Sequence, residues 1–211
     1  MVSVFRDRLV TGARSIGRSL SEKEIGAFEA HYHLLRVWSR RMNLTGLKQE
    51  EQIVRRHFLE PIAAAHLVGE EGRLVDIGSG NGFPAIPLKV LRPRIELVLV
   101  EASEKKSAFL WAVLRELRLE EARVETRHVR EIADLSDLLP CRYLTLRAIR
   151  VRDVFKKGGG TILEPDGTGL FFLSAEDAGS LRDRPVPGLR LVDALPLPSG
   201  PGSVVAILRP S

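Results

Sequence analysis

The stretch Leu74-Val-Asp-Ile-Gly-Ser-Gly-Asn-Gly-Phe-Pro84 decides the fold: a short apolar run leads to Asp76, and glycines then alternate at positions 78, 80 and 82. Such a run is typical of a buried strand, and a helix-like apolar segment follows the glycines almost at once. The pattern predicts a strand, a tight turn and the N-terminus of a helix. Glycines let the backbone approach a ligand closely, because no Cβ stands in the way. The free N–H groups of the helix would favour a carboxylate or phosphate there.

The spacing of the glycines bears on the kind of ligand. A dinucleotide-binding turn has glycines spaced G-x-G-x-x-G, and Phe83 occupies the third glycine position here. The alternating form D-x-G-x-G-x-G resembles the first motif of Rossmann-like methyltransferases that use S-adenosylmethionine. That resemblance implies that the turn, with Asp76, Gly78, Gly80 and Gly82, holds the methionine part of this cofactor.

A second acidic residue stands at the end of the next predicted strand. Residues 95–100 read as that strand, and Glu101 follows directly. A carboxylate there can accept two charge-assisted hydrogen bonds from a ribose diol, and it would repel a ribose phosphate. In the methyltransferase class, an acidic residue at this place holds the ribose hydroxyls. The residues alone leave one alternative open, a tight turn that merely packs a helix onto a sheet.

Length and composition set the outer bounds. The chain has 211 residues, of which 44% are hydrophobic, so it can bury a core and is most simply one compact unit. Without a signal-peptide pattern or a membrane-spanning stretch, we expect a soluble cytoplasmic monomer with no membrane partner. Cys141 is the only cysteine, which excludes an internal disulfide, and we expect no metal site. A net charge of +5 and a pI of about 9.7 indicate a polyanionic partner.

Apolar periodicity predicts an α/β protein with a helical cap. A capping box at Ser21-Glu-Lys-Glu24 precedes an apolar helix face from Ile25 to Trp38, and a second helical run extends from Ile53 to Leu67. We therefore expect a cap over residues 1–70 and a Rossmann-like core over residues 71–211. In that core a mostly parallel seven-stranded sheet would carry helices on both faces. The first strand is expected to end at Asp76. The other six are expected at residues 95–100, 122–126, 143–146, 169–174, 189–192 and 203–208, with proline-rich loops between Pro185 and Pro201.

Ligands of open α/β sheets sit at the carboxyl ends of the strands. We therefore expect Asp76, Glu101, Arg127 and Arg147 to converge on one rim of the sheet.

Several further segments resemble one methyltransferase family. They are Trp38 with Asn43-Leu-Thr45, Arg56-His57-Phe-Leu-Glu60, Gly82-Phe-Pro-Ala-Ile-Pro-Leu88 and Arg147-Ala148. Together they resemble the RsmG, or GidB, family, whose members methylate N7 of one guanosine in bacterial 16S ribosomal RNA. The segment 82–88 is the most specific of them, because a generic methyltransferase turn does not need two prolines there. The resemblance implies S-adenosylmethionine as cofactor and 16S rRNA or the small ribosomal subunit as partner.

The same resemblance implies roles for individual residues. Gly78 and Phe83 would contact the cofactor, the backbone of His128 and Val129 would lie along its adenine, and Arg147 would border the pocket. Guanine N7 carries a lone pair and no proton, so methyl transfer needs alignment and charge placement rather than a general base. We expect Arg147 and Arg127 to supply that positioning. The expected substrate side comprises Asn43, Arg56, His57 and Arg150, and the wider basic footprint comprises Arg36, Arg40, Arg41, Lys48, Arg55, Arg142, Arg152, Lys156 and Lys157.

The chain also departs from the family's pattern, mostly on the expected RNA side. Glu60 and Pro61 replace an Asp-Ser pair, Val129 replaces a glutamate, Leu146 replaces a serine, Ser174 aligns with a lysine, and a basic residue is missing from Pro201-Gly-Ser203. Two alternatives therefore stay open. One is a methyltransferase of the same fold that acts on a small molecule, and the other is a non-catalytic relative that binds RNA or the ribosome.

Overall fold

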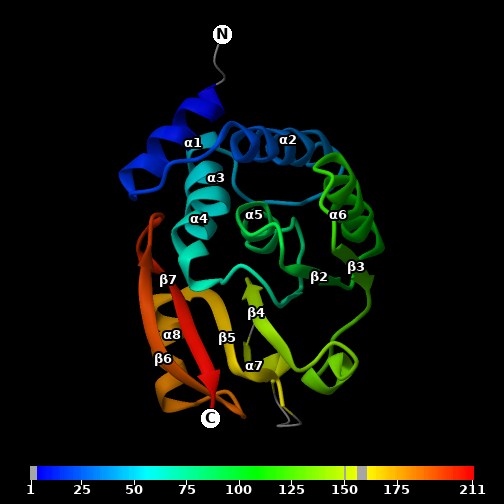
Figure 1. Ribbon diagram of the computed structural model, residues 1–211, viewed down its shortest axis with the longest axis vertical. Coiled ribbons are helices and arrows are strands. Elements are labelled where there is room, and N and C mark those ends of the chain that lie inside the picture. The colour runs from blue at the N-terminus through cyan, green and yellow to red at the C-terminus, as the bar shows by residue number, and fades with distance from the viewer. Residues whose placement is uncertain (1–3, 150, 156–160) are drawn as a thin grey trace.

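A seven-stranded sheet forms the centre of the molecule (Figure 1). The structure is a computed structural model that describes residues 4–149, 151–155 and 161–211. The strand order is β3-β2-β1-β4-β5-β7-β6. Only β7 runs antiparallel to its neighbours, which confirms the expected mostly parallel sheet. The strands are β1 (Arg73–Ile77), β2 (Glu96–Glu101), β3 (Ala122–Thr126), β4 (Cys141–Arg147), β5 (Leu163–Ser174), β6 (Leu189–Leu197) and β7 (Gly200–Pro210).

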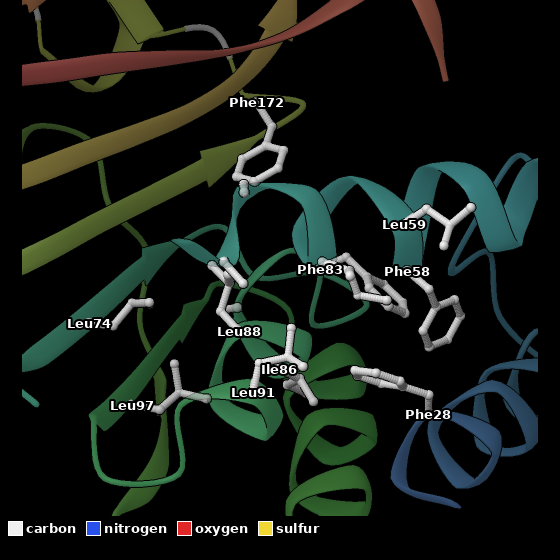
Figure 2. Close-up of a cluster of buried hydrophobic side chains, with 14 of the residues drawn as sticks. Phe28, Phe58, Leu59, Leu74, Phe83, Ile86, Leu88, Leu91, Leu97 and Phe172 are labelled. Atoms are coloured by element: carbon white, nitrogen blue, oxygen red, sulfur yellow. The ribbon is translucent and has the colours of Figure 1, made fainter. Parts of the chain in front are cut away.

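Helices cover both faces of the sheet, because successive strand residues point to opposite sides. Leu74 belongs to the apolar cluster on one face and Val75 to the cluster on the other. Figure 2 shows part of the first cluster, in which Leu74 and Leu97 of the sheet lie among side chains from the helices. The first face carries α1 (Val4–Ser15), α2 (Glu22–Trp38), α5 (Ala85–Leu91) and α6 (Glu104–Glu116), and the second carries η3 (Ile132–Leu135), α7 (Val151–Val154) and α8 (Ala175–Asp183).

The N-terminal cap packs into the first apolar cluster. The capping box of α2 is present: the Ser21 hydroxyl oxygen accepts from Glu24 N at 3.3 Å, and Glu24 accepts from Ser21 N at 2.6 Å. The second helical run is confirmed as α3 (Glu50–Ile53), a π-helix η1 (Val54–Leu59), α4 (Glu60–Ala64) and a 3₁₀ turn η2 (Ala65–Leu67). The π-helical stretch was not predicted. Figure 1 shows α1 and α2 crossing one end of the molecule, with α3 and α4 leading from there towards the sheet.

The C-terminal third differs from expectation in two ways. The proline-rich stretch expected as loops is largely a hairpin, in which Pro196 of β6 pairs with Val204 of β7. Because β6 is an edge strand, a residue without an N–H is tolerated there. Helix α8 was not predicted, and its N-cap is Ser174, whose hydroxyl accepts from Asp177 N at 3.0 Å. The segment Lys156-Lys-Gly-Gly-Gly160, expected as a helix end and a turn, lies outside the described residues.

None of the helices within the described ranges has the length and apolar character that crossing a membrane requires.

Candidate functional site

A pocket of about 480 Å³ lies at the carboxyl ends of β1 and β4. The strand order reverses between these two strands, which is where open α/β sheets bind ligands. A hollow of about 590 Å³ between α2, α5 and the end of α6 is larger, but it shares no lining residue with the glycine turn. The pocket is lined by Leu44, Thr45, Gly46, Leu47, Arg56, His57, Gly78, Ser79, Gly80, Asn81, Phe83, Glu101, Lys106, Arg147, Ala148 and Ile149.

The glycine turn is shaped by its backbone angles. Gly78, Gly80 and Gly82 have φ values of +68°, +54° and +83°, which side chains other than glycine rarely adopt. A Cβ on Gly78 would lie 2.2 Å from Ile149 Cδ1, and one on Gly82 would lie 2.4 Å from Ile86 Cδ1. A Cβ on Gly80 would meet only the carbonyl of Gly78, at 3.7 Å. Two glycines thus allow tight packing, and Gly80 leaves open space at the pocket.

The carboxylate of Glu101 faces the glycine turn, as expected. One oxygen accepts from Gly80 N at 2.8 Å and the other from Ser103 N at 2.9 Å. The residue is buried yet lines the pocket. A carboxylate offers about four lone-pair sites, so two remain for further donors. The helix N-terminus expected to face the ligand does not line the pocket, because α5 begins only at Ala85.

Asp76 is buried and is not among the residues that line the pocket, which it was expected to share with Glu101. Its Oδ1 accepts from the Thr145 hydroxyl at 2.6 Å, on the strand residue directly opposite in the β1–β4 pairing. Its Oδ2 has no hydrogen-bond partner among the described residues. Burial raises the pKa of Asp76 to about 6. The carboxylate is thus engaged by the neighbouring strand, and direct contact of Asp76 with the ligand stays a prediction.

Phe83 lies between two histidines at the floor of the pocket. Its ring stacks on His31 at 4.4 Å and on His57 at 4.6 Å between ring centroids. Figure 2 shows Phe83 beside Phe58, whose ring meets it edge-on at 5.0 Å. Burial lowers the pKa of His31 to about 4. Burial and the charge of Arg147 hold the pKa of His57 well below its ordinary value. Both imidazoles are therefore neutral at pH 7, and the floor is uncharged.

Asn81 and Thr45 join the cap to this floor. Asn81 Nδ2 donates to Leu44 O at 3.1 Å, and the Asn81 carbonyl lies 3.1 Å from His31 Nε2. Thr45 Oγ1 accepts from Leu47 N at 3.2 Å and lies 3.0 Å from His57 Nε2. His57, expected on the substrate side, lines the pocket, but it is a buried wall residue held by these contacts.

Arg147 is fixed in the opposite wall. Its Nη1 donates to Arg56 O in the π-helical stretch at 2.7 Å, and its guanidinium lies 4.7 Å from the centroid of the Phe172 ring. Its Nη2 pairs with the buried carboxylate of Glu60, whose other oxygen accepts from the Ser203 hydroxyl at 2.7 Å. Burial lowers the pKa of Arg147 to about 10, so it stays charged. Glu60 and Ser203, two departures from the family pattern, are thus joined in one network.

Arg127 is not brought to the pocket. Its two terminal nitrogens bind both oxygens of Asp137 at 2.7 and 2.8 Å, and Glu125 adds a contact at 3.3 Å. Hydrogen bonding to Asp137 raises its pKa. Its backbone N–H donates to Glu101 O at 3.1 Å, so Arg127 lies at the expected rim of the sheet. Its side chain, bound to these acids, is not among those that line the pocket, and its positioning role stays a prediction.

Three other predicted residues lie off the pocket wall. His128 is exposed, Val129 packs against the second apolar cluster, and Asn43 is exposed beside its pocket-lining neighbours. Arg56 is exposed and lines the pocket, and its expected place on the substrate side stays a prediction. Arg150 lies outside the described residues.

Some residues of the site were not predicted. Lys106 lines the pocket from the first turn of α6, where its N–H is capped by the Ser103 hydroxyl at 3.4 Å. Ile149 packs over Gly78, and His31 stacks on Phe83. The N-cap pattern at Ser103, directly after Glu101, was the one signal that could have placed Lys106 at this rim. Within the described ranges, no three His, Cys, Asp or Glu side chains gather as metal ligands.

The sequence relatives of this chain belong to one methyltransferase family. The family described as rRNA small subunit methyltransferase G (GidB) matches residues 24–182. A ribosomal RNA small subunit methyltransferase G from Geotalea uraniireducens (strain Rf4) is 43% identical over 122 residues, which cover 58% of this chain and 55% of that protein. A protein of the same name from Roseiflexus sp. (strain RS-1) is 43% identical over 121 residues, 57% of this chain and 52% of the relative. The match thus spans about half the length of these relatives.

Solved structures share the fold. A ribosomal protein L11 methylase from Lactobacillus delbrueckii subsp. bulgaricus superimposes with a TM-score of 0.59 at 9% identity, over 78% of this chain and 81% of that one. A precorrin-6y C5,15-methyltransferase from Geobacter metallireducens GS-15 superimposes with a TM-score of 0.50 at 15% identity, over 78% of this chain and 89% of that one. These likenesses show the Rossmann-like fold alone. Because the family match covers well over half of the sequence, the chain belongs to the rRNA small subunit methyltransferase G (GidB) family.

Proposed function

We propose that this chain is an S-adenosylmethionine-dependent methyltransferase that modifies guanine N7 in 16S ribosomal RNA. The observation that carries the proposal is the Glu101 carboxylate at the carboxyl end of β2, held by Gly80 N and Ser103 N in the wall of the pocket. Its two remaining lone-pair sites match the two hydroxyls of a ribose. Membership of the family supports the RNA substrate, since the relatives carry the name of a ribosomal RNA methyltransferase.

The pocket fits the proposed cofactor. Its volume lies within the range of about 300 to 1,000 Å³ found for small-molecule sites. The turn at 78–81, Phe83 and Glu101 would hold the cofactor, with Gly80 giving its backbone free approach. The neutral imidazoles of His31 and His57 do not repel a positive sulfonium. When bound, S-adenosylmethionine supplies an electrophilic methyl group on that sulfonium.

The residues of this chain would act by positioning. Guanine N7 has a lone pair and no proton, so the site needs no general base. Arg147 uses its two terminal nitrogens on Arg56 O and Glu60, which fixes the guanidinium rigidly at the wall. Its further N–H groups can donate to guanine O6 or to a neighbouring phosphate. Contact at O6 would hold the base with N7 free for reaction.

Calorimetry with S-adenosylmethionine tests the cofactor, and mass spectrometry of 16S rRNA after incubation with the protein tests the reaction. The RNA should come from cells that lack this methylation and be offered both protein-free and as small subunits. We expect cofactor binding and 7-methylguanosine at one site. Cofactor binding without rRNA methylation would favour a small-molecule substrate. RNA binding without cofactor affinity would favour a non-catalytic protein.

A further inference from the structure

A second hollow adjoins the candidate site. It has a volume of about 350 Å³ and lies at the C-terminal end of α2, against the loop that leads to α3. Thr45 and Leu47 line both this hollow and the pocket, so the loop forms a shared wall. The second hollow is lined by Leu35, Arg36, Ser39, Arg40, Thr45, Leu47, Lys48 and Ile53.

The charged residues of the second hollow are all basic. Arg36, Arg40 and Lys48 are exposed, and none of them forms an ion pair with the acids that the structure describes. Arg55, which belongs to the same predicted footprint, instead pairs with Glu51 at 2.9 Å. A cation in the last turn of α2 is favoured by the helix dipole, which is a structural reason for Arg36. Arg40 and Lys48 lie beyond the helix and have no such reason.

The two hollows together form one basic track. Arg56 and Lys106 line the pocket, and the three cations of the second hollow continue beyond the shared wall. Among the described residues, Glu101 is the only acid that lines either hollow, and its carboxylate accepts from Gly80 N in the glycine turn. None of the described residues that line the second hollow is aromatic, so none offers a ring on which a base could stack. Its chemistry therefore suits phosphate oxygens, not bases.

We propose that the second hollow binds backbone phosphates of the RNA strand next to the nucleotide that enters the pocket. The inference rests on the proposed function, because the adjoining pocket must hold the target guanine. Contacts to phosphates fix the register of a strand, whereas contacts to bases give its sequence. Arg36, Arg40 and Lys48 would thus set which nucleotide reaches Glu101 and Arg147.

The test compares two triple variants. The first combines Arg36→Gln, Arg40→Gln and Lys48→Gln. The control combines Arg182→Gln, Arg184→Gln and Arg190→Gln, which removes the same charge from exposed positions at the C-terminal end of α8 and on β6, none of which lines either hollow. The affinity for a 16S rRNA fragment is measured by fluorescence anisotropy between 50 and 200 mM salt, and the affinity for S-adenosylmethionine by calorimetry.

Loss of three phosphate contacts should lower the slope of log affinity against log salt by about 2, since each contact to a single strand contributes about 0.7. The first variant should bind RNA at least about tenfold more weakly at 100 mM salt. Its cofactor affinity and its unfolding midpoint should match the wild type, because all three side chains are exposed. Lys48→Gln alone should change the slope by about 0.7.

Equal slopes for the two triple variants would overturn the inference while wild-type methylation of the RNA still upholds the proposed function. A wild-type protein that neither binds S-adenosylmethionine nor methylates rRNA would instead refute the proposed function. If the first variant keeps its affinity for protein-free rRNA and loses affinity only for small subunits, the hollow binds a ribosomal protein, and the phosphate assignment is wrong.

Discussion

The two ends of the central sheet hold similar cations in different surroundings. At the amino ends of the strands, Arg73 pairs with Glu96 at 2.8 Å, and Arg142 pairs with Asp166 at 3.6 Å. At the carboxyl ends, Arg56 and Lys106 line the pocket, and no ion pair to a described acid neutralises either side chain. The difference teaches that net charge alone does not locate a polyanion site. A polyanion site is indicated instead by cations that form no ion pair with an acid of the same chain.

Arg147 is an exception to this contrast between the two ends of the sheet. Arg147 borders the pocket, yet it is paired with Glu60, and both side chains are buried, with exposed fractions of 9% and 1%. An exposed pair contributes little to stability, whereas a buried pair leaves an uncompensated charge when one partner is removed. Arg147 is therefore a fixed part of the wall, whereas Arg56 and Lys106 line the pocket without an ion pair to a described acid.

The largest effect is expected for Glu60→Ala. The change leaves the Arg147 guanidinium buried without a carboxylate, so it should lower the free energy of unfolding by about 3–5 kcal/mol. Urea unfolding followed by circular dichroism measures this loss. Glu51→Ala is the control, since it removes an exposed pair with Arg55 and should change stability by about 0.5 kcal/mol at most. Equal losses for the two variants would show that the buried network has no special role.

The uncharged floor of the pocket predicts a pH dependence. His31 has its pKa lowered from 6.5 to about 4 in the fold, so the unfolded chain binds more protons between these values. The stability that neutral His31 contributes is fully present above pH 6.5 and is lost as the pH falls towards 4. The loss amounts to about 3 kcal/mol. His57 acts in the same direction, whereas Asp76, with its pKa raised to about 6, opposes it below pH 6.

The contribution of His31 is isolated by comparing wild type with His31→Phe, which cannot titrate. Unfolding free energies measured from pH 7 to pH 4 should show the wild type losing up to about 3 kcal/mol more than the variant. His66→Gln, at an exposed histidine, serves as control and should follow the wild type. A constant difference between wild type and His31→Phe across this range would contradict the neutral floor.

The two ends of a single strand give the next test. Glu101 stands at the carboxyl end of β2 and Glu96 at its amino end. Glu101→Gln should weaken S-adenosylmethionine binding on the order of 10- to 100-fold, because charge-assisted hydrogen bonds to the ribose are lost. Glu96→Gln, which loses only pairs with Arg73 and Arg123, should leave binding unchanged. Calorimetry measures both, and similar affinities for the two variants would remove the carboxylate from the proposed cofactor site.

Local patterns in the sequence predicted much of this molecule. The seven strands, the capping box at Ser21 and the turn with Glu101 beside it follow from periodicity, capping chemistry and glycine spacing. Each of these signals lies within a few residues of the feature that it predicts. The predicted strand ends also indicated which residues lie at the rim of the sheet, because parallel strands end at the same edge.

The contacts that the sequence did not indicate involve side chains whose partners are distant in sequence or compete locally. The Ser203 hydroxyl donates to Glu60, which lies 143 positions earlier in the sequence, and no local pattern indicates this contact. Arg127 was expected at the pocket because it follows the end of a strand. Its guanidinium instead binds Asp137, ten residues later in the sequence. Asp76 lies one residue before the end of β1, and its carboxylate accepts from Thr145 on the neighbouring strand instead of lining the pocket.

The smallest effect is expected where cations are already paired. Arg123→Gln and Arg142→Gln at the amino ends of the strands should leave RNA affinity and its salt dependence unchanged, because Glu96, Glu125 and Asp166 already neutralise these side chains. Stability should change by about 0–1 kcal/mol each, as for other partly exposed pairs. The anisotropy titration of the triple variants measures the first quantity and urea unfolding the second. A loss of RNA affinity as large as that of the Arg36, Arg40 and Lys48 variant would mean that RNA binds to both ends of the sheet. Net charge, and not the unpaired cations of the carboxyl end, would then determine binding.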